Sequence, residues 1–470
     1  MNSENYQTTI DVVSSLVDEL MVASCPRCDT IKSGCKIPWL NEEDEPGVVC
    51  IGPYYHDPLH RNEQEKRLVL HNLLPVDEKQ KVDKLRRLFE AVYTIEKEAR
   101  GHYVDHPWTM DSAEFVQMLV LDGCYILGKF VLPHCCHPAG LSVSDGKGAD
   151  FTGSPALSDS CSQVSSSIQS AGMGMAAKSN RRGHAMRNVA LVRDVFCRLD
   201  NQIPFCVLDT IHKVLHGNKM SGSCTLVADT VARQLRELLQ NLSYSVVGAK
   251  IHKPWHLNHL LHMHFQPVSV DEKPNAAAAA AARVYRWRSA TQYHAAGVRF
   301  KTRHLDGGGA RSILDVELDG LTLRMPSLTV DNNTCTILRN LMNLEQHNPE
   351  IGSHVTAYCV FMSQLAGTAH DVELLARKGI IVHALLTDSH VAEMLASLCS
   401  GITIDLDEPR HSYLHKTRKA LERLYQSRRV HCMTLPRRNP WLVLALFAAI
   451  VALLCNLLQA IYIIKTYYRT

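Results

Sequence analysis

The 470-residue sequence lacks the marks of a secreted protein, a disulfide scaffold or a nucleic-acid-binding protein. Its first 24 residues contain no Lys or Arg and include the acids Glu4, Asp11, Asp18 and Glu19, whereas a secretory signal has a basic start and an unbroken apolar stretch. The sixteen cysteines are unevenly spaced, and several stand singly in apolar segments, as buried thiols in a reducing compartment do. With 50 Lys+Arg against 47 Asp+Glu, the chain has no large net positive charge that would attract nucleic acid.

Three catalytic signatures are also missing. The chain has no Gly-x-Ser-x-Gly elbow, no His-Glu-x-x-His and no Gly-x4-Gly-Lys-Ser/Thr loop. These absences argue against the hydrolase, zinc-protease and P-loop classes, although a triad can also assemble from distant residues. We expect no cofactor and leave open whether the protein is an enzyme, leaning against it.

What the chain does have is a long apolar run near its C-terminus. Residues Trp441 to Ile464 carry no charge over 24 positions, which at about 1.5 Å per residue span roughly 36 Å. A buried core helix rarely runs this long without a polar face, so we predict a membrane-spanning helix that contacts lipid. Asn456 and Gln459 could pair two such helices in a homodimer, but we favour polar groups tolerated near the membrane interface.

Charge on either side of this run predicts its orientation. From 411 to 438 the only acid is Glu422, whereas after the run only Lys465 and Arg469 are basic, so the positive-inside rule places the N-terminal body in the cytosol. The span is synthesised close to the end of the chain, and no signal sequence precedes it, which also favours a cytosolic N-terminal body. We therefore expect a single-pass protein, tail-anchored in the plasma membrane, with unglycosylated sequons at Asn241 and Asn332. The same basic residues could also attract anionic lipid; they are Lys416, Arg418, Lys419, Arg423, Arg428, Arg429, Arg437 and Arg438.

Apolar periodicity predicts a mainly α fold with a few short β-strands. A helix is expected over Asp83–Ala99, with Leu85, Leu88, Val92 and Ile95 on one face. A buried helix is expected over "MDSAEFVQMLVLDGCYILGKFVL", with a capped start near Ser112 and Glu114. Pro204 should break or restart a helix, "GVRFK" and "ILDVELDGLTLRMPSL" should form strands, and residues 333–400 should be mainly helical.

Composition and apolar periodicity also predict the domain organisation. An N-terminal amphipathic helix and linker occupy 1–34, and a globular domain occupies 35–410, interrupted by a flexible Ser/Gly/Ala-rich insert at 138–186. The basic juxtamembrane segment occupies 411–438, the span 441–464 and a short tail 465–470.

Two groups of residues have metal-ligand character. Cys25, Cys28 and Cys35 could join the "HCCH" of His134 to His137, but one CxxC without a matching second is weak, and we favour spare thiols.

The second group is the segment "IHKPWHLNHLLHMHF". Pro254 suits the first turn of a helix, which would leave His252 outside and place His256 and His259 on one face. We favour a partly exposed helix that simply buries its leucines, and predict no metal there; the leucines are Leu257, Leu260 and Leu261.

The stretch "VVCIGPYYHD" (48–57) raises the choice between a reactive and a structural site. We expect a short buried strand formed by Val48, Val49 and Ile51, which Gly52-Pro53 then turns. The following Tyr54, Tyr55 and His56 should pack and hydrogen-bond beneath the next helix, on which Glu63 and Lys66 can pair. No nucleophile or paired acid accompanies His56, so we favour the structural interpretation.

Seven blocks together resemble a known family. In order they are "VVCIGPYYHD", "MDSAEFVQMLVLDGCYIL", "LDNQIPF", "AAGVRFK", "LRNLMNLEQ", "DVELLARKGII" and "NPWLVLALFAAIVALLCNLLQAIY". This order is similar to the plant domain-of-unknown-function 247 proteins and covers roughly 35–464. The motif residues carried by the resemblance are Gly52, Pro53, Tyr54, His56, Asp122, Gly123, Asn201, Gln202, Pro204, Gly297, Asn340, Glu345, Asn439, Pro440 and Trp441.

The resemblance implies a single-pass plant membrane protein without an established activity. Some grass relatives are implicated in self-incompatibility, which implies protein–protein recognition or signalling through a protein partner. The family's usual His after the first Tyr is Tyr55 here, and its Glu-Asn-Gln begins with Asp200, so a catalytic role for that His is hard to sustain. The alternative is a membrane-tethered hydrolase or metal-dependent enzyme using His56, Asp122 or the histidine-rich segment.

Overall fold

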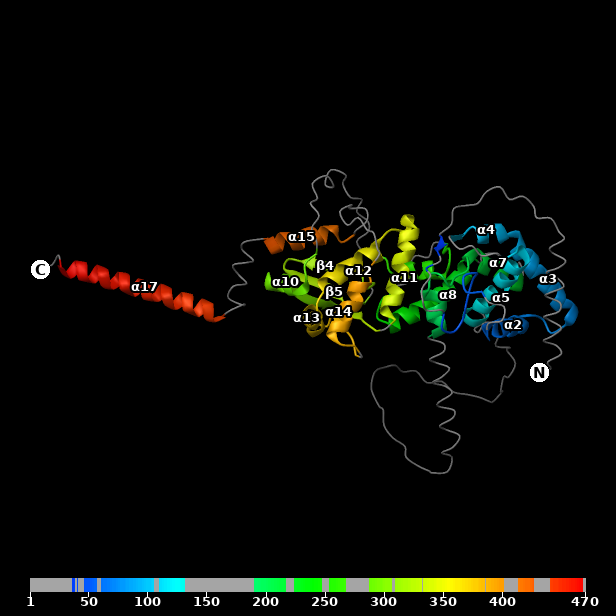
Figure 1. Ribbon diagram of the computed structural model, residues 1–470, viewed down its shortest axis with the longest axis horizontal. Helices are drawn as coiled ribbons and strands as arrows, with labels where there is room; N and C mark the ends of the chain where they lie inside the picture. Colours follow the sequence, from blue (N-terminus) through cyan, green and yellow to red (C-terminus); the bar gives the residue numbers. More distant parts are fainter. Residues whose placement is uncertain are drawn as a thin grey trace, which may run out of the picture.

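A computed structural model of the chain is mainly helical, as the sequence predicts (Figure 1). It describes residues 36–38, 40, 46–56, 61–104, 110–131, 190–216, 224–246, 253–267, 287–306, 309–331, 333–384, 386–400, 413–426 and 440–467. The predicted helix at 1–34 and the predicted insert at 138–186 lie outside these residues, so both stay predictions.

Helices α2 to α8 form one end of the body (Figure 1). The long α5 lies against α2, α3 and α7, and α3 also packs on α7. A helix at 190–197 precedes Pro204, and α7 begins at the next residue, so the predicted break at this proline is confirmed. The elements are α2 (Arg61–Leu73), α3 (Glu78–Thr94), α4 (Glu96–Arg100), α5 (Ser112–Phe130), α7 (Phe205–His216) and α8 (Cys224–Asn241).

Helix α3 begins earlier than predicted because Asp77 caps it. The Asp77 carboxylate accepts a hydrogen bond from the N–H of Gln80, which satisfies a free donor of the first turn. Leu85, Leu88 and Val92 are buried on one face, as predicted. The helix ends at Thr94, and α4 follows after the break at residue 95, so the predicted single helix to residue 99 is wrong.

Helix α5 is the central buried helix of this end. Its cap is Asp111, whose side chain accepts from the N–H of Glu114, so the predicted capped start is confirmed. Thirteen of its residues are buried. Gly123 lets α7 approach closely, because a Cβ there would lie 2.4 Å from Cδ1 of Ile211.

The other end of the body combines short strands with helices α10 to α14. Strand β5 (Thr322–Pro326) lies between β3 (Arg299–Arg303), to which it is parallel, and β4 (Glu317–Asp319), to which it is antiparallel. The predicted strands are therefore present. Gly297, with φ of +93°, ends α10 just before β3, a conformation that favours glycine.

The region from 333 to 400 is mainly helical, as predicted. Two further strand pairs are parallel. β1 (Ile37–Pro38) pairs with β2 (Tyr103–Val104), and β6 (Leu328–Thr329) pairs with β7 (Ile381–Val382). The helices are α9 (Leu257–Met263), α10 (Ala290–Ala295), α11 (Thr334–His347), α12 (His354–Leu365), α13 (Ala369–Arg377) and α14 (Asp388–Ser397). One continuous apolar core runs from Ile37 to Leu421 and joins both ends of the body.

Helix α15 (His415–Gln426) packs on this body, whereas α17 (Pro440–Tyr467) stands apart from it (Figure 1). Glu422 of α15 accepts two hydrogen bonds from Arg288, at 3.0 and 2.9 Å. The Tyr413 hydroxyl donates to the carbonyl of Leu314 at 2.6 Å. Helix α15 is thus held against the folded body by polar contacts as well as by its apolar face.

Candidate functional site

The segment before Gly52 is buried but is not a strand. Val49 and Ile51 are buried, yet among the described residues no strand pairs with them. Side chains take the place of a partner strand: Asp194 accepts from the N–H of Val48 at 2.6 Å, and Asn201 accepts from the N–H of Ile51 at 2.6 Å. The predicted strand is wrong, because these backbone groups are satisfied by residues far along the chain.

The predicted turn at Gly52-Pro53 is confirmed. Gly52 has φ of +77°, and a Cβ there would lie 2.4 Å from the carbonyl oxygen of Gln202. Its N–H donates to Oδ2 of Asp122 at 2.7 Å. Position 52 therefore requires glycine for both conformation and space.

Asp122 forms a buried ion cluster with Lys66 and Glu63. The Lys66 ammonium lies 2.6 Å from Oδ1 of Asp122 and 2.5 Å from Oε1 of Glu63, which confirms the predicted Glu63–Lys66 pair. Desolvation acts to lower the pKa of Lys66, but the two carboxylates together raise it, so Lys66 stays charged. Desolvation raises the pKa of Asp122. The cluster fixes α2, α5 and the Gly52 turn to one another.

The two tyrosines after the turn also have structural partners. The Tyr54 hydroxyl donates to the carbonyl of Ile37 at 2.6 Å and accepts from the N–H of Val104 at 3.1 Å, so it bridges β1 and β2. The Tyr55 hydroxyl donates to Asp200 at 2.5 Å. The predicted hydrogen-bonding role of these tyrosines is confirmed.

His56 has no acid close enough to form a catalytic pair among the described residues that contact it. Its Nε2 lies 3.9 Å from Oε1 of Glu114, beyond hydrogen-bond distance. Asp122 is bonded to Lys66 and the Gly52 turn, and Glu345 contacts other histidines. A pocket joining His56 to Asp122 or Glu345 would favour the enzyme alternative, and the described contacts of these two acids do not provide that arrangement.

Asn201 and Gln202 organise the loop before Pro204. The Asn201 amide donates to the carbonyls of Val49 and Asp194, each at 3.0 Å. The Gln202 amide nitrogen donates to two carbonyls of the preceding turn at 2.7 Å, and its oxygen accepts from the N–H of Asn258 at the start of α9. Both side chains are buried, so the motif joins three distant segments.

Asn340 and Glu345 extend the same framework along α11. Asn340 accepts from the N–H of Leu199 at 2.7 Å and donates to the carbonyl of Thr336. Glu345 accepts from the N–H groups of Val355 and Thr356 at 2.9 and 2.8 Å, so it caps the start of α12. Asn201, Gln202, Asn340 and Glu345 thus hold separate segments of the described structure together.

The histidine-rich segment differs from its prediction. Pro254 precedes α9 and is not in its first turn, because His256 is the N-cap and accepts from the N–H of His259. All of α9 is buried, so the expected partly exposed helix is wrong, although its leucines are buried as predicted. His256 and His259 therefore do not share a helical face as predicted, although their ring centroids lie 6.1 Å apart; His252 lies outside the described residues.

A different histidine of this segment meets an acid. Nε2 of His262 lies 2.8 Å from Oε1 of Glu345, and Nδ1 of His354 lies 3.9 Å from the same oxygen. One ligand atom from each of the three residues lies within 4.8 Å of the others. Burial lowers the pKa of His262 to about 3 and that of His354 to about 4, so both rings are neutral at pH 7. His354 lies outside the histidine-rich segment, and no pattern in the sequence links it to His262 or Glu345.

The basic segment is only partly described. In α15, Lys416, Lys419 and Arg423 are exposed, but Arg418 is 5% exposed and cannot face a membrane in this arrangement. The rest of the segment, with Arg428, Arg429, Arg437, Arg438 and Asn439, lies outside the described residues. The candidate zinc ligands Cys25, Cys28, Cys35 and His134 to His137 do too.

Helix α17 is long and apolar enough to cross a membrane. Its candidate span, Leu444–Ile464, has 21 residues with a mean hydropathy of 2.4, and none of it is buried against the described body. Trp441 is 79% exposed, and Asn456 and Gln459 lie on the exposed helix. The core-helix alternative therefore does not describe α17.

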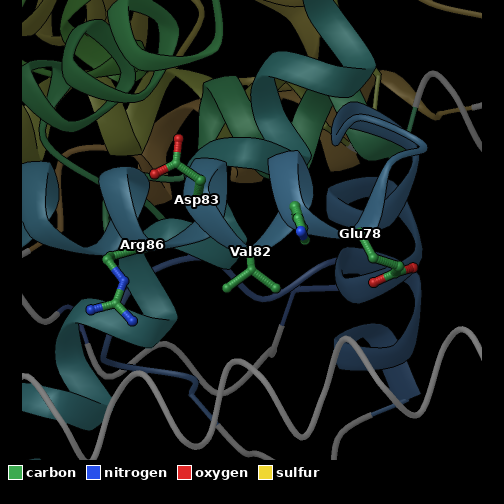
Figure 2. Close-up of a pocket in the computed structure, with 5 residues that line it drawn as sticks. Glu78, Val82, Asp83 and Arg86 are labelled. Carbon is green, nitrogen blue, oxygen red and sulfur yellow. The ribbon is translucent and has the colours of Figure 1, made fainter.

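One open depression lies on the outer face of α3 (Figure 2). All of its lining side chains come from this one helix; they are Glu78, Lys79, Val82, Asp83 and Arg86. No nucleophile, histidine or acid from a second element converges on it among the described residues. It therefore does not resemble an active site.

The chain is similar to two proteins of Arabidopsis thaliana. UPF0481 protein At3g47200 of Arabidopsis thaliana is 24% identical over 450 residues, which cover 90% of this chain and 83% of that protein. UPF0481 protein At3g02645 of the same plant is 30% identical over 176 residues, 36% of this chain and 32% of that protein. No solved structure matches. The family model described as "Plant protein of unknown function" matches residues 40–455, and the chain therefore belongs to this family, DUF247, as its seven blocks indicate.

Proposed function

We propose that the chain is a single-pass membrane protein whose helical body acts in protein–protein recognition or signalling. The observation that carries the proposal is the exposed apolar surface of α17, which no described part of the body covers. Exposed apolar area of this extent is unfavourable in water, and lipid would bury it. The basic side chains before α17 support a cytosolic body, and the plasma membrane is the membrane we propose.

The body itself supports binding over catalysis. The motif residues with reactive groups are occupied in holding segments together: Asp122 by Lys66, Asn201 by backbone groups and Glu345 by the start of α12. No relative's name and no described pocket supports the hydrolase alternative. These contacts stabilise the body, and we propose that its surface binds protein partners.

Extraction of membranes from plant cells tests the anchor. The full chain should stay in the pellet after a carbonate wash, and the variant Leu453→Arg/Leu454→Arg should move to the supernatant, because each central Arg costs about 3 kcal/mol in a bilayer. Leu453→Ala/Leu454→Ala is the matched control and should stay in the pellet. Release of the intact wild-type chain would overturn the anchor.

Proximity labelling from an N-terminal fusion tests recognition and sidedness. The control carries the same label on residues 427–470 alone, so that both fusions share the proposed span. Cytosolic proteins enriched by the full chain over this control support recognition by the body. Equal labelling by the two fusions contradicts recognition, and labelling of extracellular proteins alone contradicts the orientation.

A further inference from the structure

Three helices bring two imidazoles and one carboxylate together inside the body. His262 comes from the last turn of α9, Glu345 from α11 and His354 from the first turn of α12. The side chains of His262, Glu345 and His354 are 3%, 1% and 12% exposed. These three residues therefore form a cluster of potential metal ligands inside the body, separate from the Gly52 turn.

The spacing of their ligand atoms suits a metal ion. Two ligands of a tetrahedral ion, each about 2.0–2.1 Å from it, lie roughly 3.3 Å apart. The distances from Oε1 of Glu345 are 2.8 Å to Nε2 of His262 and 3.9 Å to Nδ1 of His354. These values bracket the ideal separation, so small side-chain rotations suffice to close the site around an ion.

Hydrogen bonding explains two members of the cluster but leaves the third unexplained. Glu345 caps α12 and accepts from His262, which accounts for both side chains. His354 lies too far from Glu345 for a hydrogen bond, and its Nε2 is buried with no partner among the described residues. An ion held by Glu345 would be ligated by Nδ1 of His354, which faces that carboxylate, and the ring proton would then lie on Nε2.

We propose that His262, Glu345 and His354 bind one divalent transition-metal ion of the zinc class, which ties α9, α11 and α12 together. Neutral imidazole and carboxylate ligands favour such an ion over Ca²⁺ or Mg²⁺, which take oxygen ligands. Water or another small ligand would take the fourth position. The role is structural, so it is independent of the recognition function proposed above.

The test measures metal bound to the untagged full chain in detergent. Zinc content is determined by elemental analysis, and ZnCl₂ and CoCl₂ are then titrated into the metal-free protein. Because cysteines and histidines outside the described residues could also bind zinc, the readout is the difference between wild type and His354→Gln. His354→Gln should hold one equivalent less zinc and lose the visible d–d absorption of one cobalt ion.

Two further variants separate ligation from structure. His347→Gln removes an exposed histidine two residues after Glu345 and should bind zinc as the wild type does. His354→Cys supplies a thiolate in place of the imidazole, so its cobalt form should gain thiolate-to-metal charge-transfer absorption. Circular dichroism of each metal-free variant confirms that it is folded.

The outcomes are decisive in either direction. One equivalent lost in His354→Gln, retained in His347→Gln and spectrally changed in His354→Cys supports the site. Equal zinc binding by wild type and folded His354→Gln overturns it, as does an equal loss in His347→Gln, which indicates adventitious surface binding. If His354→Gln does not fold, a folded His354→Cys whose cobalt form gains no thiolate-to-metal absorption over the wild type overturns the proposal.

Discussion

Replacing Asn201 by alanine should strongly destabilise the body. Asn201 is fully buried and accepts from the N–H of Ile51 at 2.6 Å while donating to the carbonyls of Val49 and Asp194 at 3.0 Å. A buried backbone group that loses its partner costs about 1–3 kcal/mol, and water can enter part of the space. We therefore expect Asn201→Ala to lower the free energy of unfolding by about 3–5 kcal/mol, a large share of a typical 5–15 kcal/mol.

Urea unfolding of the full chain in detergent micelles, followed by far-UV circular dichroism, measures this change. The matched control is Asn343→Ala, at a half-buried position of α11, which should stay within about 0.5 kcal/mol of wild type. Asn201→Asp keeps the shape but turns an oxygen toward two carbonyls, so it should cost at least as much as alanine at pH 7. A loss below about 1 kcal/mol in Asn201→Ala would refute the view that this motif residue is structural.

Three further perturbations follow from the described contacts, and the same unfolding assay measures each. Gly52→Ala should lose about 2–4 kcal/mol because its Cβ would meet the carbonyl of Gln202 at 2.4 Å in a left-handed conformation; an unchanged midpoint would contradict this geometry. Lys66→Met should lose about 3–5 kcal/mol, because it leaves the carboxylate of Asp122 buried and unpaired, and a neutral result would show that the pair is dispensable. Burial lowers the pKa of His212 to about 4, below the ordinary 6.5, so the unfolded chain takes the proton first as pH falls and stability declines between pH 6.5 and 4. His212→Leu should reduce that decline by about 2–3 kcal/mol, and identical pH profiles would contradict the assignment.

Local patterns predicted much of the fold. The apolar run from 112 to 130 indicated a buried helix, and Glu63 and Lys66, three residues apart, predicted the observed pair. Gly52-Pro53 predicted the turn that both backbone conformation and space demand. Each of these features depends on neighbours within a few residues, which is the information that spacing and composition carry.

Features that depend on distant partners were missed. Val48 to Ile51 has the composition of a strand, yet its N–H groups bond to side chains about 150 residues away. His262 meets Glu345 across 83 residues, and no spacing rule links those positions. The start of α9 also depends on His256 as its cap, which shifted the helix relative to Pro254 and undid the predicted histidine face.

The packing of α15 on the body limits the distance between the body and a bilayer that contains α17. Because Glu422 is fastened to Arg288, only residues 427–439 separate the end of α15 from the start of α17. Even fully extended, that connector reaches about 45 Å. With α17 in lipid as proposed, the body would search a thin layer along the membrane surface, where partners confined to the same layer meet it at high effective concentration. Contacts too feeble to persist in free solution would then be enough for recognition.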